Sequence, residues 1–477
     1  MKRIQLFLVG VLIAIGPLMA QSADSDWKAG VDRVKGLIQS NPTQATDEAE
    51  LLLKGKNKKN PELVVALANA YLDAGKLPEA EVYLALAKKI NPRSAIASVL
   101  EGDIAVAKKE AGTACQLYEQ AIFFDPKCEE AYLKFADVYK GASPQLAIEK
   151  LEQLRAINPT STVPDKKLAE IYYLNNRFDK AADAYARFIN SPEATEDDLM
   201  KYAFALFLSH KFEQSLDIAN KGLQRNSRHA AFNRLAMYNY TDLKRYDEAQ
   251  KAATAFFNSS EKADFSYLDY MYFGHLLNAV KKYDEAVAQY KKALELDPTK
   301  TDLWREISTA YENGNHYPEA IAAYKQYYAT LPADKQTPDM QFQLGKLYYG
   351  QGTQTDSLVI NAVGRKAALA SADSVFAVIA QAAPDSYLGN FWRARTNSAL
   401  DPETSQGLAK PYYEGIVTLL TGKNDPRYNP ALIECYSYLG YYYLVANKLP
   451  ESKEYWNKIL AIDPANATAK KALDGLK

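Results

Sequence analysis

Apolar residues recur along this chain with the spacing of one face of a helix. In residues 61–94, four of them fall on a single helical stripe: Val64, Leu67, Ala68 and Tyr71. Gly75 then permits a turn. Pro78 and Glu79 suit the start of a second helix, where a missing N–H does no harm and a carboxylate favours the helix dipole. The stretch predicts two antiparallel helices joined by a short turn.

A five-residue phrase marks the start of each second helix. It runs basic residue, aromatic residue or leucine, proline or acid, polar residue, small residue, as in residues 76–80, 282–286 and 448–452. The small residues, which we call ladder residues, form a series: Ala80, Ala114, Ala147, Ala181, Ser215, Ala249, Ala286 and Ala320. Their steps are 34, 33, 34, 34, 34, 37 and 34 positions. A fixed period of this size predicts a repeat architecture.

The pattern resembles the tetratricopeptide repeat, which has large, small and tyrosine positions on its first helix and small, aromatic and proline positions on its second. The fullest match lies in residues 301–334: Trp304, Ile307, Ser308, Tyr311, Tyr317, Ala320, Tyr324 and Pro332. The resemblance extends over residues 25–470. It implies an all-α chain, folded as a right-handed superhelical solenoid of about 11–12 helix pairs.

Departures from the period divide the chain into five expected parts. They are a signal peptide (1–20), N-terminal capping helices (21–60), a regular array (61–334), a repeat with an inserted loop (335–386), and C-terminal repeats with a capping helix (387–477). The insertion adds about fifteen residues to one repeat. We expect it to lengthen an inter-helix turn and to contain a short helix near residues 363–370.

The N-terminus has the pattern of a targeting segment. Lys2 and Arg3 precede an apolar run over residues 6–15, and residues 18–20 suit a cleavage site. The run is short for a membrane span, although an uncleaved anchor is the alternative. No cysteine follows it, so we expect no lipid anchor. The sequence thus predicts a periplasmic protein, secreted through a cleavable signal peptide, and resembles secreted repeat proteins of the Bacteroidetes.

Charge and cysteine content exclude some classes of protein. Without residues 1–20 the chain keeps 55 basic and 58 acidic residues, a net charge of −3, so we expect no binding to nucleic acid. The odd number of cysteines argues against a disulfide framework. Cys115, Cys128 and Cys435 are expected to be small buried residues.

The sequence offers no pattern for catalysis. None of its four histidines has a second ligand at metal spacing, and no phosphate loop, nucleophile elbow or paired-cysteine motif occurs. We therefore predict no enzyme, no cofactor and no metal. Residues 356–358, Asp-Ser-Leu, resemble the O-glycosylation acceptor of Bacteroidetes, which suggests a sugar in the inserted loop.

The first helices of a tetratricopeptide array line a ligand groove, so their outward positions are the candidate site. In residues 129–161 these positions, Glu130, Leu133, Asp137 and Lys140, form an unremarkable mixture. In the middle of the chain they are rich in methionine and aromatic residues: Met200, Phe204, Phe207, Asn233, Met237, Tyr240, Leu268, Met271, His275 and Asn278. Such side chains suit an adaptable protein contact. If the assigned helix phase is off by one residue, they belong to the core instead.

These features predict a non-catalytic scaffold or adaptor of the cell envelope that binds segments of other envelope proteins in its groove. The alternative is a glycan- or peptidoglycan-binding protein that uses tyrosines such as Tyr173 and Tyr240 as sugar platforms. A weaker third reading is an accessory subunit of an envelope enzyme. The oligomeric state is not predicted.

Overall fold

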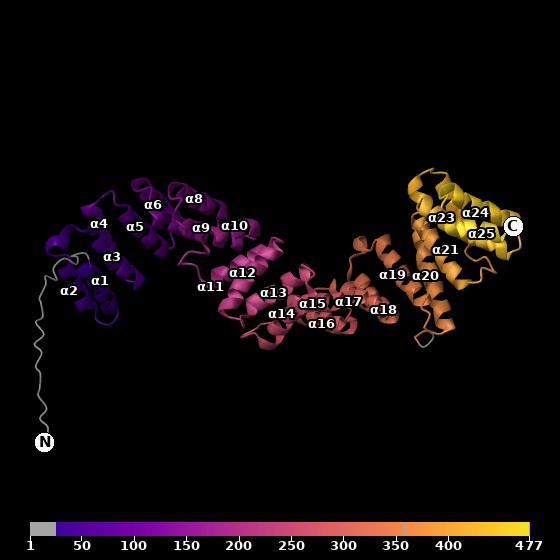
Figure 1. The fold of residues 1–477 in the computed structure, drawn as a ribbon. Coiled ribbons are helices and arrows are strands. Elements are labelled where there is room, and N and C mark those ends of the chain that lie inside the picture. The colour runs from indigo at the N-terminus through magenta and orange to yellow at the C-terminus, as the bar shows by residue number, and fades with distance from the viewer. Residues whose placement is uncertain (1–24, 357–358, 477) are drawn as a thin grey trace, which may run out of the picture. The chain divides into compact units, whose positions relative to one another are not determined.

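The computed structural model describes residues 25–356 and 359–476, and this part of the chain is helical throughout (Figure 1). Its 25 α-helices follow one another as twelve antiparallel pairs and a closing helix, which confirms the predicted all-α solenoid. The chain divides into two compact units, and the boundary after Gly222 falls within α12. The predicted signal peptide lies outside the described residues and stays a prediction.

Unit 1 contains six helix pairs. Its helices are α1 (Ser25–Leu37), α2 (Pro42–Leu52), α3 (Pro61–Asp73), α4 (Leu77–Ile90), α5 (Ala95–Ala107), α6 (Ala111–Phe124), α7 (Glu129–Tyr139), α8 (Pro144–Ile157), α9 (Val163–Leu174), α10 (Phe178–Phe188), α11 (Glu196–Leu208) and α12 (Phe212–Arg225). A short 3-10 helix, Gly55–Lys59, links α2 to α3.

Unit 2 contains the other six pairs and the closing helix. Its helices are α13 (Ala230–Asp242), α14 (Tyr246–Ser259), α15 (Tyr267–Ala279), α16 (Tyr283–Leu296), α17 (Leu303–Asn313), α18 (Tyr317–Thr330), α19 (Pro338–Gly352), α20 (Ala362–Ala382), α21 (Leu388–Leu400), α22 (Lys410–Thr421), α23 (Asn429–Val445), α24 (Leu449–Ile462) and α25 (Ala467–Gly475). Two short 3-10 helices, Ala333–Lys335 and Pro426–Tyr428, precede α19 and α23.

The turn inside most pairs has one left-handed residue, five positions before the ladder residue. These residues have φ between +54° and +73°: Gly75, Lys109, Asn176, His210, Lys244, Lys281, Asn315 and Asn447. The next amide donates back into the first helix, as from Lys282 N to Leu277 O at 2.8 Å. This is the Schellman closure of a helix. Only one of the eight residues is glycine, so the backbone hydrogen bonds hold the others in an unfavourable region.

The two helices of a pair meet at small residues. We call the residue of the first helix that meets the ladder residue the crossing residue. Side-chain hydrogen bonds fix the match: Ser215 Oγ donates to Ala203 O at 2.8 Å, and Ser452 Oγ donates to Gly440 O at 2.7 Å. Each of these pairs is twelve positions apart. Counting back twelve from a ladder residue therefore locates the crossing.

Where the crossing residue is glycine, an aromatic ring from the second helix fills the space. A Cβ on Gly102 would lie 2.4 Å from the Tyr118 ring, and one on Gly274 would lie 2.4 Å from the Tyr290 ring. No side chain fits between such a backbone and its ring. The aromatic positions predicted on the second helices are thus part of the pair's core.

The insertion changes one pair without disturbing its crossing. Gly345 faces the Phe376 ring across 31 positions, against 16 for Gly274 and Tyr290, so fifteen residues are added. The extra residues extend into the start of α20, a continuous helix of 21 residues. The prediction of a separate short helix near residues 363–370 was wrong. Asn361 caps α20 by accepting a hydrogen bond from Gly364 N at 2.8 Å, and no proline interrupts residues 362–382.

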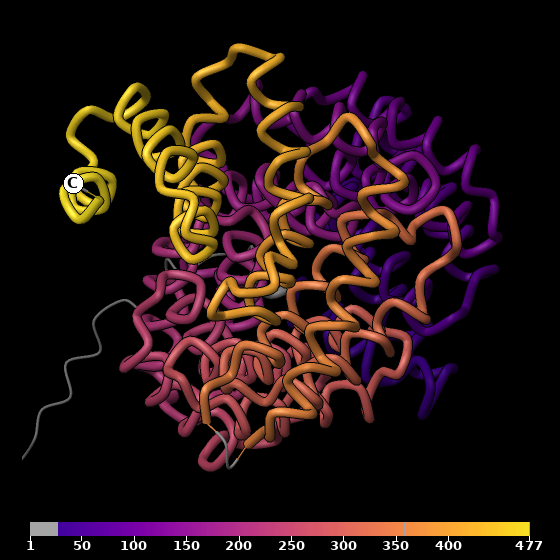
Figure 2. The backbone as a smooth tube through the Cα atoms, turned by 90° about the vertical axis from the view of Figure 1, so that its right-hand side faces the viewer, coloured from indigo at the N-terminus to yellow at the C-terminus, as the bar shows by residue number. Residues whose placement is uncertain are grey.

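The ends of the array are covered. At the N-terminal end Trp27 and Val34 of α1 join the core formed with α3. At the C-terminal end α25 packs on α24, as the yellow tube in Figure 2 shows, and Ala469 and Leu476 join the core around Trp456. Cys115 and Cys435 are buried free thiols and Cys128 is a partly buried one. Burial raises the pKa of all three.

First helices pack on first helices. In unit 1, α3 contacts both α1 and α5, and α5 also contacts α7; in unit 2, α13 contacts α15. Within the described residues no two second helices pack comparably closely. The first helices therefore lie on the inner side of each stack, where the sequence analysis places the groove.

Candidate functional site

In unit 1 the predicted groove residues lie on α11. Met200, Phe204 and Phe207 are partly exposed and flank the crossing residue Ala203. The Phe207 ring contacts the Phe212 ring, with centroids 5.8 Å apart. Leu208 follows with 43% of its surface exposed. α11 thus presents a row of apolar side chains on the inner side of unit 1.

In unit 2 four predicted residues lie on α15. Leu268 is exposed, and Met271, His275 and Asn278 are partly exposed. His275 Nε2 lies 3.8 Å from Glu306 Oε2 of the next first helix, and Asn278 Oδ1 accepts a hydrogen bond from Asn313 at 3.2 Å. Burial lowers the pKa of His275, although the Glu306 carboxylate opposes the shift. Neighbouring first helices are thus linked by polar side chains on their inner face.

The predicted residues on α13 require a correction. Asn233 and Met237 are buried, with 4% and 0% exposure, so they belong to the core and offer no surface to a partner. Asn233 Nδ2 donates to Ser227 O at 2.9 Å and to Ser260 Oγ at 3.2 Å. Tyr240 is partly exposed, and the Arg245 guanidinium lies 4.8 Å from its ring centroid.

The error comes from a helix phase that was assigned one residue off. The sequence left this alternative open. Counting back twelve from Ala249 makes Met237 the crossing residue. Residue size alone would favour its neighbour Ala236, because the other crossings use small residues. The inner positions of α13 are instead Arg234, Tyr238 and Thr241. The ladder count finds them, but only the structure fixes the separation at twelve positions.

Arg234 and Tyr238 build a polar cluster around one buried carboxylate. Asp269, with no exposed surface, accepts hydrogen bonds from Arg234 Nε and from Tyr238 OH, each at 2.7 Å. It also caps α15, accepting from the Ser266 amide at 2.7 Å. The cluster satisfies the charge of Asp269 and ties α13 to α15. The cluster therefore has a structural role, which is to pair a buried charge, and it needs no ligand to account for it.

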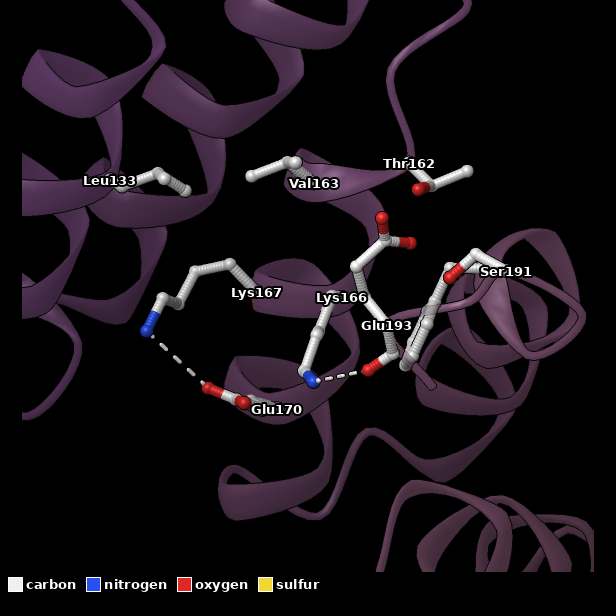
Figure 3. Close-up of a pocket in the computed structure, with 9 residues that line it drawn as sticks. Leu133, Thr162, Val163, Lys166, Lys167, Glu170, Ser191 and Glu193 are labelled. Atoms are coloured by element: carbon white, nitrogen blue, oxygen red, sulfur yellow. Dashed lines mark hydrogen bonds and ion pairs between the residues drawn. The ribbon is translucent and has the colours of Figure 1, made fainter. Parts of the chain in front are cut away.

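Unit 1 has a hollow on its inner side that the sequence did not single out (Figure 3). It encloses about 580 Å³, part of it open solvent, between α7, α9 and the loop from α10 to α11. Its apolar lining comes from three separate segments: Leu133, Val163 and Phe188. In the sequence, Leu133 belongs to the mixed outward positions of residues 129–161. Its partners come from other repeats, so no local pattern could reveal the hollow.

Two lysines stand beside the hollow, and both have partners (Figure 3). Lys166 Nζ lies 3.1 Å from Asp198 Oδ2 and donates to Glu193 O at 3.2 Å. Lys167 Nζ lies 2.9 Å from Asp137 Oδ1. It also lies 3.5 Å from Glu170 Oε2. Both lysines of the rim are therefore held in internal pairs, and the carboxylate of Glu193 also lines the hollow.

These pairs continue a periodic arrangement along unit 1. Two such pairs link neighbouring first helices of unit 1: Asp103 of α5 lies 3.1 Å from Lys134 of α7, and Asp137 of α7 lies 2.9 Å from Lys167 of α9. Although burial opposes the shift, Lys140 and Lys167 lower the pKa of Asp137. Burial by itself would lower the pKa of Lys167. The carboxylates of Asp137 and Glu170 raise it above its ordinary value. Acidic and basic side chains of α5, α7 and α9 are thus paired with one another on the inner face of unit 1.

Within residues 25–356 and 359–476, no three His, Cys, Asp or Glu side chains are grouped so as to hold a metal ion. In the same part of the chain, no helix combines the length and apolar character needed to cross a bilayer. Ser357 and Leu358 of the suggested glycosylation motif lie outside the described residues.

Two segments of the chain match a known repeat family. Residues 65–127 and 274–335 match the family model described as Tetratricopeptide repeat. No curated protein matches the chain.

Solved structures of bacterial repeat proteins are similar to this chain. The C-terminal part of a TPR repeat-containing protein from Cytophaga hutchinsonii is 29% identical, with a TM-score of 0.45, and the match covers 58% of this chain and 99% of that one. A tetratricopeptide repeat protein from Parabacteroides merdae is 16% identical over 52% of this chain and 98% of that one, with a TM-score of 0.32. YrrB, described as a TPR protein with an unusual peptide-binding site, is 17% identical over 37% of this chain and 92% of that one, with a TM-score of 0.30.

Proposed function

We propose that this tetratricopeptide-repeat protein is a non-catalytic scaffold of the cell envelope that holds a segment of another protein against the inner face of unit 1. The observation that carries the proposal is the apolar surface there, formed by the hollow and by Met200, Phe204 and Leu208 on α11. Exposed apolar patches on soluble proteins usually mark interaction sites. Tetratricopeptide-repeat proteins are generally protein-binding scaffolds.

The mechanism requires no covalent step. Helix pairs with filled crossings and closed turns form a rigid surface, so a segment that binds there meets a preformed face. Affinity then comes from burying apolar area while little of the protein has to be ordered.

The envelope location rests on the N-terminal pattern of Lys2, Arg3 and the apolar run in residues 6–15. We expect the partners to be other envelope proteins or their peptide segments, and neither nucleic acid nor a lipid anchor to be involved. Membrane fractionation and N-terminal sequencing of the protein from its native cell test this part. A chain that retains residues 1–20 would contradict cleavage.

A crosslinking pull-down from envelope extract tests the scaffold function. The wild type is compared with the double variant Phe204→Ala/Phe207→Ala, and a captured protein is then purified and titrated against both. The matched control is Phe123→Ala on α6, a second helix of the same unit, because Phe123 is 73% exposed. We expect the double variant to lose the partner, by about tenfold or more in Kd, and the control to keep it.

The rival glycan function is an outcome of the same experiment. Retention of the wild type on peptidoglycan, with no captured protein, would replace the scaffold proposal. Tyr240 is a poor sugar platform in this structure, because Arg245 occupies one face of its ring.

A further inference from the structure

We propose that the hollow between α7 and α9 is a specificity pocket for one bulky apolar side chain, presented by an uncharged stretch of the bound protein segment. The inference rests on the proposed function and names the chemistry of its partner. Three features support it: the lining of the hollow, the pairing of the charges around it, and its continuation onto α11.

The lining favours a hydrocarbon or aromatic side chain. Phe188, at the end of α10, is buried to 1% exposure and its side chain lines the hollow. Leu133 of α7 and Val163 at the start of α9 form its walls, and Val163 keeps 39% of its surface exposed. Burying a large apolar side chain against such walls strengthens binding by roughly 10- to 150-fold.

The pairing of the two rim lysines favours an uncharged ligand side chain. Lys166 is held by Asp198 and Glu193 O, and Lys167 is held by Asp137 and Glu170. A carboxylate on the ligand would have to displace one of these acids, and an ammonium would approach two lysines. An uncharged residue leaves every pair intact.

The same compensation extends beyond the rim. Asp103 accepts a hydrogen bond from Tyr118 at 2.7 Å and pairs with Lys134, and Asp137 also pairs with Lys140 at 2.9 Å. Residues of the segment that flank the buried side chain therefore meet acids, Asp103 and Asp137, that already have cationic partners. Charge complementarity thus points to a neutral segment, whose binding is insensitive to salt.

The surface next to the hollow calls for a chain rather than a small molecule. α11 follows the loop that borders the hollow, and its Met200 and Phe204 are partly exposed on the inner side of the same unit. A small molecule would use the hollow alone. A protein segment would place one side chain in the hollow and further apolar residues along α11.

The test is selection of displayed random peptides on the purified full-length chain, followed by titration of the selected peptides by fluorescence anisotropy. We expect selected peptides to share one bulky apolar residue in an uncharged stretch, and replacing that residue with alanine to weaken binding about tenfold or more. Kd should change less than about twofold between roughly 50 and 500 mM salt.

Val163→Trp, which fills the hollow, should weaken binding by at least about tenfold. Val163→Lys, which puts a charge into it, should do the same and serves if the tryptophan variant misfolds by circular dichroism. The matched control is Val82→Trp on α4, a second helix where Val82 is 67% exposed, and it should bind like the wild type.

Four results would overturn the inference. If selected peptides are acidic or basic and weaken with salt, or if both Val163 variants bind like the wild type while Phe204→Ala does not, the pocket assignment fails and the scaffold function stands. If the wild type self-associates and Val163→Trp does not, the occupant is a second copy of this chain. If no peptide binds the wild type, the proposed function fails, and this inference fails with it.

Discussion

Single residues decide how closely the two helices of a pair approach. Gly274 lies against the ring of Tyr290, which is buried, and whose hydroxyl has no hydrogen-bond partner within the described residues. The ring contributes by filling space rather than by a polar contact. The loss of unfolding free energy caused by one added methyl group at the crossing therefore measures how rigid the pair is.

Gly274→Ala should destabilise the protein by about 1–3 kcal/mol, because its Cβ would lie 2.4 Å from a ring that cannot move aside. Urea unfolding measures the change. The matched control is Gly415→Ala within α22, where a Cβ would meet no other atom within 4 Å. It should be neutral or stabilising by up to about 1 kcal/mol, because alanine favours helix. Equal effects of the two variants would contradict the close crossing.

His275 should make the stability of the protein fall in mild acid. Burial lowers its pKa below the ordinary value of 6.5, so the folded state holds the imidazole neutral while the unfolded chain takes up a proton. Protonation therefore favours unfolding as pH falls through 6.5 toward the lower, folded-state pKa. Unfolding free energies at about pH 7.5 and pH 5.5 should differ less for His275→Gln than for the wild type. An identical pH dependence in both proteins would refute this assignment.

At the scale of elements, the helix–turn–helix pair is the unit that the chain repeats. Its turn is closed by backbone hydrogen bonds and has a left-handed residue, which is lysine at position 281 with φ +64°. A Cβ in that region is strained relative to glycine. Glycine occupies the same place at position 75. The turn therefore tolerates residues that do not favour it, because the pair as a whole imposes it.

Lys281→Gly should stabilise the protein by up to about 1 kcal/mol, since relief of the left-handed strain exceeds the entropy that glycine adds to the unfolded chain. Thermal melting checks the sign. Lys282→Gly is the control, because Lys282 has φ −95° and gains nothing from the missing Cβ. A melting temperature that falls for Lys281→Gly would contradict the argument.

At the scale of the whole molecule, each stack must close its open ends. A repeat buries its core against its neighbours, so the last repeat would expose one apolar face without a cap. α25 supplies that cover with Ala469 and Leu476, which lie in the core around Trp456 and Ile459. The helix belongs to no pair, and its contribution is to unit 2 as a whole.

Truncation before Ala467 should lower the melting temperature and cause the protein to associate, because Trp456 and Ile459 become exposed. Light scattering after gel filtration and a thermal melt measure the two effects. The control is Lys470→Ala on the exposed side of α25, which should melt and elute like the full chain. A monomeric, equally stable truncated chain would show that α25 is not a cap.

The sequence alone determined the repeat, the number of helix pairs and most crossing residues. It could do so because most crossings depend on small residues at a fixed separation within one pair. This requirement is local, and it recurs in every repeat. Gly345 and Phe376 keep their contact across fifteen added residues for the same reason.

Only the tertiary structure decided the phase of α13 and the existence of the hollow. Met237 and Ala236 are neighbours in the sequence, and packing against α14 selects the larger one for the crossing, which moves Asn233 and Met237 into the core. The hollow joins Leu133, Val163 and Phe188, each of which belongs to a different helix. Contacts between repeats arise from stacking, and stacking is a property that no single repeat encodes.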